Sequence, residues 1–333
     1  MALEFDLIDT FFKPLCFGLS ELEVGIGDDG AVISAPANHQ LVVVTDTLVA
    51  GVHFPVEATA ADIAWKAVAV NLSDLAAMGA KPGFYSLALT LPENNQEWLK
   101  DFAAGLKAVS ERFKMPLVGG DTTKGPLTIT VTAQGWVPKG QAILRSGAQL
   151  KDLICVTETI GDGALGLKVA LNQLAIDPGF ELDKKMMLSA LNRPIPQLDI
   201  APGLVGLVNS AIDISDGLLA DLGHVLSRST EKAEGVVLGA EIALPHLPLS
   251  ESVKQYVHAT GDWALPLSGG DDYELCMTVS AENLPVLERY FSTTGVRLSV
   301  IGKITNSGKV VCVDEQGHAV DRLNMHKSGY SHF

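Results

Sequence analysis

The sequence alternates between short apolar runs rich in β-branched residues and longer stretches with helical periodicity. Residues 41–45 form an apolar run that stops at Asp46, which predicts a buried strand delivering a carboxylate at its C-terminal end. Residues 59–80 predict a helix that Thr59 can cap. Further strands are predicted at 84–91, 127–137 and 153–156, and a second helix at 95–113. We therefore expect an α/β protein, which some schemes would class as α+β.

The chain is long enough for two domains. It has 333 residues, and its 24 lysines and arginines against 39 aspartates and glutamates give a formal net charge of −15. The pattern turns polar over residues 145–152 before the next apolar run, so we expect an N-terminal domain of residues 1–148 and a C-terminal domain of residues 149–333. The acidic surplus argues against nucleic acid and anionic membranes as partners.

The cysteines and the N-terminus indicate the compartment. Cys16, Cys155, Cys276 and Cys312 lie far apart without a C-x-x-C spacing, and we interpret them as reduced, packed thiols. The first residues lack the basic start and apolar run of a signal peptide, and no uncharged apolar stretch reaches membrane-spanning length. These features predict a cytoplasmic protein.

Residues 25–30 match the G-x-G-x-x-G expression of dinucleotide-binding proteins. That motif should open a helix whose N-terminus meets a pyrophosphate, whereas residues 31–33 and Pro36 follow here. Two aspartates in the loop would also repel a bare pyrophosphate unless a divalent metal lay between them. We therefore reject a Rossmann interpretation. A P-loop is also missing, because its nearest match, residues 302–309, is one residue too long and continues with Val310.

Aspartates recur at the ends of the apolar runs, where solvated surface carboxylates would not be favoured. For any single one of them, an Asx-turn or a helix cap is a sufficient explanation, and this alternative stays open. The collection as a whole is harder to explain in this way. Its members are Asp28, Asp29, Asp46, Asp121, Asp213 and Asp216.

Asp74 strengthens the case for a metal. On the predicted helix it shares a face with apolar side chains and with Asn71. A buried, unpaired carboxylate costs several kcal/mol, so Asp74 needs a cation or must become protonated. With other carboxylates expected nearby, we favour a divalent metal over the alternative, a buried salt bridge to Lys66 or Lys81.

Two further places are candidates for binding. Residues 211–218 set Asp213 and Asp216 three positions apart with the Ser215 hydroxyl between them, although a plain N-cap role for Asp216 is a strong alternative. His53 is a candidate for contacting a substrate phosphate, but a lone histidine is more often a satisfied structural residue.

Short motifs follow one another in order along both halves of the chain. They occupy residues 25–31, 45–54, 71–80, 119–123, 145–147, 212–218, 269–275 and 329–333. Together they resemble the thiamine-monophosphate kinase family. The resemblance implies the fold of aminoimidazole-ribonucleotide synthetase and selenophosphate synthetase. In that fold an N-terminal domain pairs with its copy across a homodimer, and a C-terminal domain closes the ATP site.

The resemblance also implies roles for single residues. Magnesium ligands would be Asp29, Thr45, Asp46, Asp74, Asp121, Asp213 and Asp216, and ATP contacts would be Gly120, Asp121, Arg145 and Ser215. His53, Asp271 and Tyr330 would line the thiamine-phosphate site, with Tyr330 stacking on the thiazolium unless it is only a terminal anchor. At Asp271 the family's G-G-E-D-Y-E-L segment leads us to expect glutamate, and aspartate is shorter by about 1.5 Å.

The implied activity is the last step of thiamine diphosphate biosynthesis, in which ATP phosphorylates thiamine monophosphate and ADP is released. We expect direct in-line transfer assisted by several magnesium ions, with no catalytic side chain and no covalent intermediate, because a phosphate nucleophile is already deprotonated. Two alternatives stay open. One is another enzyme of the same fold, although no reactive Cys or Lys of the kind selenium chemistry requires stands near the N-terminus. The other is a non-catalytic acidic metal-binding module, which Arg145 argues against.

Overall fold

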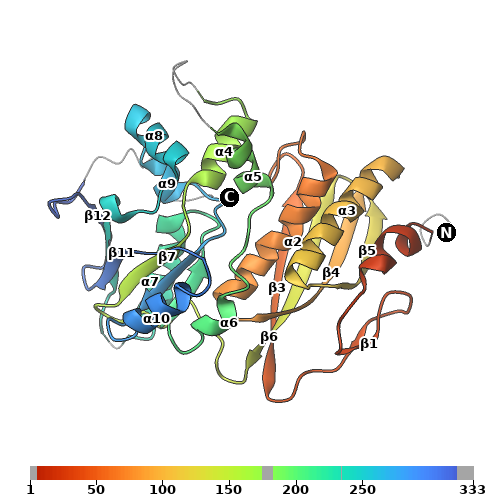
Figure 1. Cartoon of the computed structure of the whole chain (residues 1–333), viewed down its shortest axis with the longest axis horizontal. Coiled ribbons are helices and arrows are strands. Elements are labelled where there is room, and N and C mark those ends of the chain that lie inside the picture. The colour runs from red at the N-terminus through yellow and green to blue at the C-terminus, as the bar shows by residue number, and fades with distance from the viewer. Residues whose placement is uncertain (1–5, 175–182, 234, 321–333) are drawn as a thin grey trace. The chain divides into compact units, whose positions relative to one another are not determined.

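The computed structural model describes residues 6–174, 183–233 and 235–320, and the chain divides into two compact units (Figure 1). The first unit comprises Met1–Ala76 with Ala80–Ala142, and the second comprises Ala77–Gly79 with Ile143–Phe333. Helices and strands occur in both units, which confirms the expected α/β class. The main division follows residue 142, whereas the sequence placed a boundary after residue 148.

The first unit is built on a four-stranded mixed sheet with the strand order β3-β6-β4-β5. β6 runs antiparallel to both of its neighbours, and β4 and β5 are parallel. Two long helices, α2 and α3, cover one face of this sheet (Figure 1). The described elements of this unit are η1 (Ile8–Phe12), η2 (Lys13–Leu15), β1 (Leu22–Val24), β2 (Val32–Ile33), β3 (His39–Val49), α2 (Ala60–Ala77), β4 (Lys81–Leu91), α3 (Gln96–Phe113), β5 (Leu117–Lys124) and β6 (Thr128–Pro138).

The β3 strand is longer than the sequence predicted. It runs from His39 to Val49, so Asp46 lies within the strand and not at its end. The alternation of side chains continues past Asp46, and residues 47–49 pair with residues 128–130 of β6, which adds ladder hydrogen bonds. On one face Val42 and Leu48 are buried. On the other face the strand carries exposed side chains.

The helices begin where the sequence predicted. The Thr59 hydroxyl accepts the backbone N–H of Asp62 at 3.1 Å, which caps α2, and Asn95 caps α3 in the same way. The two helices are packed closely, because a Cβ at Gly105 of α3 would lie 2.3 Å from the Ala61 carbonyl oxygen of α2. Only glycine allows this approach, which holds α2 and its Asp74 in place on the sheet.

The second unit contains a six-stranded sheet in the order β12-β9-β11-β7-β10-β8, antiparallel except for the parallel pair β12 and β9. Its described elements are β7 (Leu153–Thr157), α4 (Asp162–Ala170), α5 (Lys184–Asn192), α6 (Ala201–Leu204), β8 (Ser210–Asp213), α7 (Leu218–Thr230), β9 (Gly239–Ala243), η3 (Leu244–His246), α8 (Glu251–Thr260), α9 (Ala264–Ser268), β10 (Leu275–Val279), α10 (Leu284–Phe291), β11 (Leu298–Thr305) and β12 (Val310–Val313).

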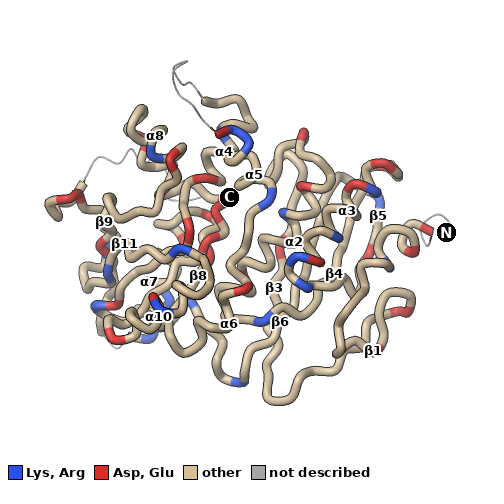
Figure 2. The backbone as a smooth tube through the Cα atoms, viewed as in Figure 1, with Lys and Arg blue, Asp and Glu red and all other residues tan. Residues whose placement is uncertain are grey.

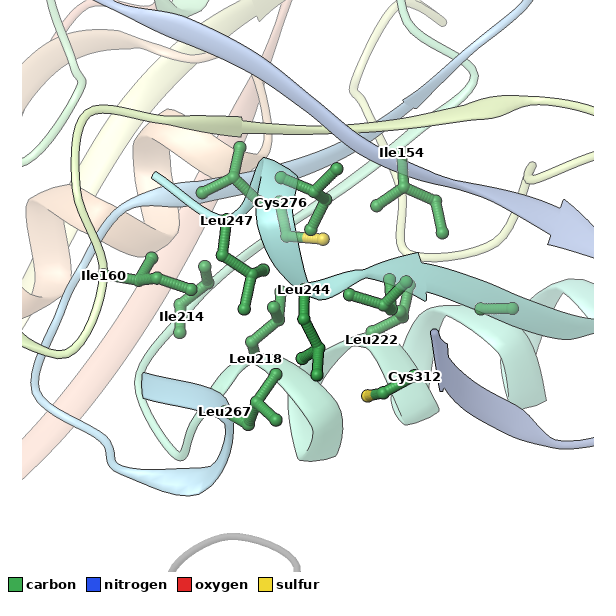
Figure 3. Packing of buried hydrophobic residues seen from close by; sticks show 14 of the residues in the cluster. Ile154, Ile160, Ile214, Leu218, Leu222, Leu244, Leu247, Leu267, Cys276 and Cys312 are labelled. Atoms are coloured by element: carbon green, nitrogen blue, oxygen red, sulfur yellow. The ribbon is translucent and has the colours of Figure 1, made fainter. Parts of the chain in front are cut away.

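One hydrophobic core holds α7 against this sheet. Figure 3 shows Leu218 and Leu222 of α7 among buried side chains that include Ile154 and Cys276 from the strands. Each fully buried leucine or isoleucine contributes about 1.5–3 kcal/mol by leaving water. This core fixes the place where β8 ends and α7 begins.

Charged residues of both signs are spread over the elements of both units (Figure 2). The surplus of carboxylates is therefore not confined to one segment. Across the residues that the structure describes, none of the helices combines the length and the apolar character needed to cross a bilayer.

Candidate active site

The turn between β8 and α7 carries the densest group of predicted site residues. β8 ends at Asp213, which is 4% exposed, and Ser215 and Asp216 follow in the turn as half-buried residues. The Asp221 carboxylate on the first turn of α7 accepts three backbone N–H groups, those of residues 215, 216 and 217, at 3.0–3.1 Å. The turn is thus folded around one carboxylate oxygen, which orients Ser215 and Asp216.

Asp216 does not cap α7. The N-cap is Gly217, whose φ of 118° favours glycine, and its backbone approaches the Ser268 backbone so closely that a Cβ would lie 2.7 Å from it. The N-cap interpretation of Asp216 is therefore wrong. The Asp216 side chain does not cap the helix N-terminus, and the Asp221 carboxylate accepts the backbone N–H groups of the turn instead.

Three carboxylates crowd this turn. Burial, together with the negative charges of Asp213 and Asp216, raises the pKa of Asp221 to about 7, even though the backbone N–H groups of residues 216 and 217 act to lower it. Such crowding of like charges is unfavourable unless a cation lies nearby. The donors are carboxylate and hydroxyl oxygens, which are the ligands that magnesium prefers.

A glycine-rich loop, residues 269–273, packs against this turn. The backbone N–H of Asp271 donates to the Ser215 carbonyl oxygen at 3.0 Å, and that of Tyr273 donates to the Ile214 carbonyl oxygen at 2.8 Å. A Cβ at Gly270 would lie 2.2 Å from the Ser215 carbonyl oxygen, so glycine is required there. The structure therefore brings the predicted substrate residue Asp271 next to the predicted ATP residue Ser215.

Arg145 lies on the segment that leads into β7, with an exposed side chain. The Ser229 hydroxyl on α7 donates to the Arg145 carbonyl oxygen at 3.4 Å and accepts the N–H groups of Gly147 and Ala148 at 3.1 Å. This arrangement fixes the backbone beside the guanidinium group and leaves the side chain open to solvent.

In the first unit, the predicted residues lie on the turn before β2 and on the sheet. Asp29 is exposed in that turn, where its N–H donates to the Asp28 carboxylate at 2.9 Å. The turn leads into a strand and not into a helix, which confirms the rejection of a Rossmann motif. Thr45 and Asp46 are neighbours on β3, so their side chains project from opposite faces of the sheet.

The α2 helix carries Asp74 as a half-buried residue. One turn earlier, Asn71 is fully buried; its amide nitrogen donates to the Ala67 carbonyl oxygen at 3.0 Å, and its Oδ1 atom has no hydrogen-bond partner among the residues that the structure describes. Residues three apart lie on the same side of a helix. A buried carbonyl oxygen near a carboxylate fits a cation or a cation-bound water better than an apolar core.

The remaining predicted residues are in three places. Gly120 and Asp121 lie on the edge strand β5, where a Cβ at Gly120 would lie 1.9 Å from the Leu87 carbonyl oxygen, and Asp121 is exposed. His53 is half-buried, and its Nδ1 atom accepts the Val49 N–H at 3.0 Å, so a neutral ring carries its proton on Nε2. Tyr330 lies outside the described residues.

Comparison with known proteins bears on the whole chain. The family described as AIR synthase related protein, N-terminal domain, matches residues 27–137. A thiamine-monophosphate kinase of Haemophilus influenzae is 43% identical over 302 residues, covering 90% of this chain and 89% of that protein. The chain belongs to the thiamine-monophosphate kinase family. The resemblance inferred from the short motifs is therefore confirmed.

Solved structures of thiamine-monophosphate kinases share the fold. The crystal structure of the enzyme from Stenotrophomonas maltophilia is 41% identical, with a TM-score of 0.81 over 90% of this chain and 93% of that one. A structure described as AaThiL complexed with AMPPCP and TMP is 30% identical, with a TM-score of 0.74 over 99% of this chain and 97% of that one. The chain thus shares the fold of solved thiamine-monophosphate kinases.

Sequence reasoning missed a group of inward-facing carboxylates in the thiamine-monophosphate kinase fold. Besides Asp221, they are Asp272, which accepts the N–H groups of Gly161 and Gly163, and Glu274, which accepts the Thr157 hydroxyl at 2.5 Å. Burial raises the pKa of both Asp272 and Glu274 well above the usual range. The available signal was the G-G-D-D-Y-E-L segment, which contains three acidic residues, of which only Asp271 was considered.

The two units share the seven predicted magnesium ligands. Asp29, Thr45, Asp46, Asp74 and Asp121 belong to the first unit, and Asp213 and Asp216 to the second. Within the described ranges, no three His, Cys, Asp or Glu side chains are arranged so that they could hold a metal together. The oxygen donors fit magnesium in kind, because the turn crowds carboxylates and α2 buries the Asn71 side-chain oxygen, which has no partner in the described part of the chain.

Proposed function

We propose that the protein transfers the γ-phosphoryl group of ATP to thiamine monophosphate, giving thiamine diphosphate and ADP as the last step of thiamine diphosphate biosynthesis. The observation that carries the proposal is the similarity over 99% of the chain to a structure described as complexed with AMPPCP and TMP. The curated thiamine-monophosphate kinase of Escherichia coli is also 41% identical over 99% of the chain.

Magnesium would be held by the carboxylates of Asp29, Asp46, Asp74, Asp121, Asp213 and Asp216, together with Thr45. Because the side chains of Thr45 and Asp46 project from opposite faces of β3, an ion shared by the two would have to meet Thr45 through its backbone carbonyl oxygen. When bound, the cations neutralise the charge that develops between two polyanions. A protein of net charge −15 needs such neutralisation to hold both phosphates.

The remaining residues divide between the two substrates. Gly120, Asp121, Arg145 and Ser215 would contact ATP, and the exposed guanidinium of Arg145 suits a phosphate. His53, Asp271 and Tyr330 would line the thiamine-phosphate site. The His53 Nε2 atom is the ring nitrogen that can donate to a phosphate oxygen, since Nδ1 already accepts the Val49 N–H. No side chain is required as a general base, because the attacking phosphate oxygen is already ionised.

We place the protein in the cytoplasm as a homodimer. Leu41 and Val43 are 48% and 54% exposed on the sheet face opposite α2 and α3, and a second copy would cover them. The free state of Cys16, Cys155, Cys276 and Cys312 suits a reducing compartment. Light scattering at micromolar concentration should give the mass of two chains, and a stable monomer would contradict this arrangement.

Calorimetric titration tests the substrate assignment. In the presence of magnesium and AMPPCP, thiamine monophosphate should bind, and free thiamine should bind far more weakly because it lacks the phosphate that meets the metal. EDTA should abolish the difference between the two ligands. Equal binding of thiamine and its monophosphate would contradict the proposed phosphate site.

A further inference from the structure

The loop that carries Asp271 has an unusual backbone. Asp271 and Tyr273 both have positive φ angles, 67° and 54°, and neither is glycine. Residues other than glycine rarely adopt a positive φ, because it brings Cβ close to the backbone. Asp271 and Tyr273, which flank Asp272, keep this backbone conformation only because surrounding contacts hold the loop.

Contacts on both sides supply that restraint. On one side, the N–H groups of Asp271 and Tyr273 bond to the carbonyl oxygens of residues 215 and 214, as described above. On the other side, the Asp272 carboxylate accepts the Gly161 N–H through both oxygens at 2.9 Å and the Gly163 N–H at 3.3 Å. A Cβ at Gly163 would lie 2.1 Å from the Asp271 carbonyl oxygen. The backbone of the loop is therefore clamped between two turns.

The positive φ of Tyr273 has a consequence for its side chain. The Tyr273 hydroxyl, two residues along the loop, donates to Oδ1 of Asp271 at 3.1 Å. Both side chains are half-buried. A phenol that donates to a carboxylate restricts the rotation of that carboxylate.

We propose that Tyr273 is a positioning residue that holds the Asp271 carboxylate toward the thiamine-phosphate substrate. This inference rests on the proposed function, in which Asp271 contacts that substrate. Aspartate has one fewer rotatable side-chain bond than glutamate, and the hydrogen bond from the Tyr273 hydroxyl restricts the remaining rotation of the Asp271 carboxylate. Tyr273 therefore affects the binding of thiamine monophosphate, whereas ATP would bind to Gly120, Asp121, Arg145 and Ser215.

The test is the Tyr273→Phe variant, which keeps the ring and removes only the hydroxyl. Its KM for thiamine monophosphate should rise about 3- to 10-fold, the worth of one hydrogen bond, while its KM for ATP stays unchanged. Calorimetric titration of thiamine monophosphate with magnesium and AMPPCP should show the same loss of affinity. Tyr256→Phe is the matched control, because the Tyr256 hydroxyl also donates to a carboxylate, that of Asp262, at 2.9 Å.

Asp271→Ala and the double variant separate the possible failures. Asp271→Ala should raise the same KM, and adding Tyr273→Phe to it should change nothing further, because Tyr273 acts through Asp271. If Asp271→Ala has no effect on thiamine monophosphate, the substrate role of Asp271 is wrong. If Asp271→Ala has its effect but Tyr273→Phe does not, or if the two effects add, the positioning role alone is wrong. Equal rises in both KM values for Tyr273→Phe would also overturn it.

Discussion

Replacing Asp272 by alanine should destabilise the second unit by a predictable amount. The substitution leaves the N–H groups of Gly161 and Gly163 without their acceptor, and a buried donor without a partner costs about 1–3 kcal/mol. Two such donors give about 2–6 kcal/mol. Removing a carboxylate that is itself desolvated offsets part of this loss, so we expect a net destabilisation of about 2–3 kcal/mol.

Urea unfolding and amide hydrogen exchange measure this effect. In Asp272→Ala the unfolding midpoint should fall, and the amides of Gly161 and Gly163 should exchange faster than in the unchanged protein. Asp183→Ala is the control: the Asp183 carboxylate also accepts a helix N-terminal N–H, that of Met186 at 2.9 Å, but it is exposed and its loss should cost about 1 kcal/mol or less. If the two variants lose the same stability and the glycine amides stay protected, the reasoning about Asp272 is refuted.

Substitutions at three other positions test the site. Burial raises the pKa of Glu274, so the stability that Glu274 contributes is fully present below its pKa in the unfolded chain and is lost as the pH rises through its pKa in the folded protein. Urea midpoints measured between about pH 4 and 8 should therefore decline with pH, and Glu274→Gln should flatten this decline. An unchanged slope would contradict this reasoning. Asp74→Asn should fold but lose activity that added magnesium only partly restores, because an amide does not replace a charged ligand; wild-type turnover in a steady-state assay would make Asp74 structural. Asp271→Glu should be tolerated, whereas Asp271→Ala should weaken binding of thiamine monophosphate more than that of ATP, and equal losses would move Asp271 out of the substrate site.

The sequence predicted the regular elements of the first unit well, because their signals are local. Thr59 caps α2 as predicted, the helix predicted at 95–113 is α3, and the strands predicted at 84–91 and 127–137 are β4 and β6. The end of β3 was missed because Asp46 looks like a terminator, whereas the pairing of residues 47–49 with β6 outweighs the weak strand propensity of one aspartate.

The organisation of the β8–α7 turn was harder to predict for a physical reason. An N-cap role is the local expectation for Asp216, but the N–H groups of the turn are satisfied by Asp221, a whole helical turn further along. The partners of Asp272 lie more than 100 residues away, at Gly161 and Gly163, and no local pattern reveals such a contact. A metal at Asp74 was inferred from its place on the helix, whereas the complete set of metal ligands came from the family resemblance, and both stay predictions.

Product analysis tests the central claim most directly. The purified protein should be incubated with magnesium-ATP and either thiamine monophosphate or thiamine, and chromatography should resolve thiamine, its monophosphate and its diphosphate while a coupled assay follows ADP. The account predicts one ADP per thiamine diphosphate formed from the monophosphate, no consumption of thiamine, and no product when EDTA removes the metal. Consumption of thiamine, or formation of ADP without thiamine diphosphate, would contradict the proposed kinase activity and favour another ATP-dependent enzyme of this fold.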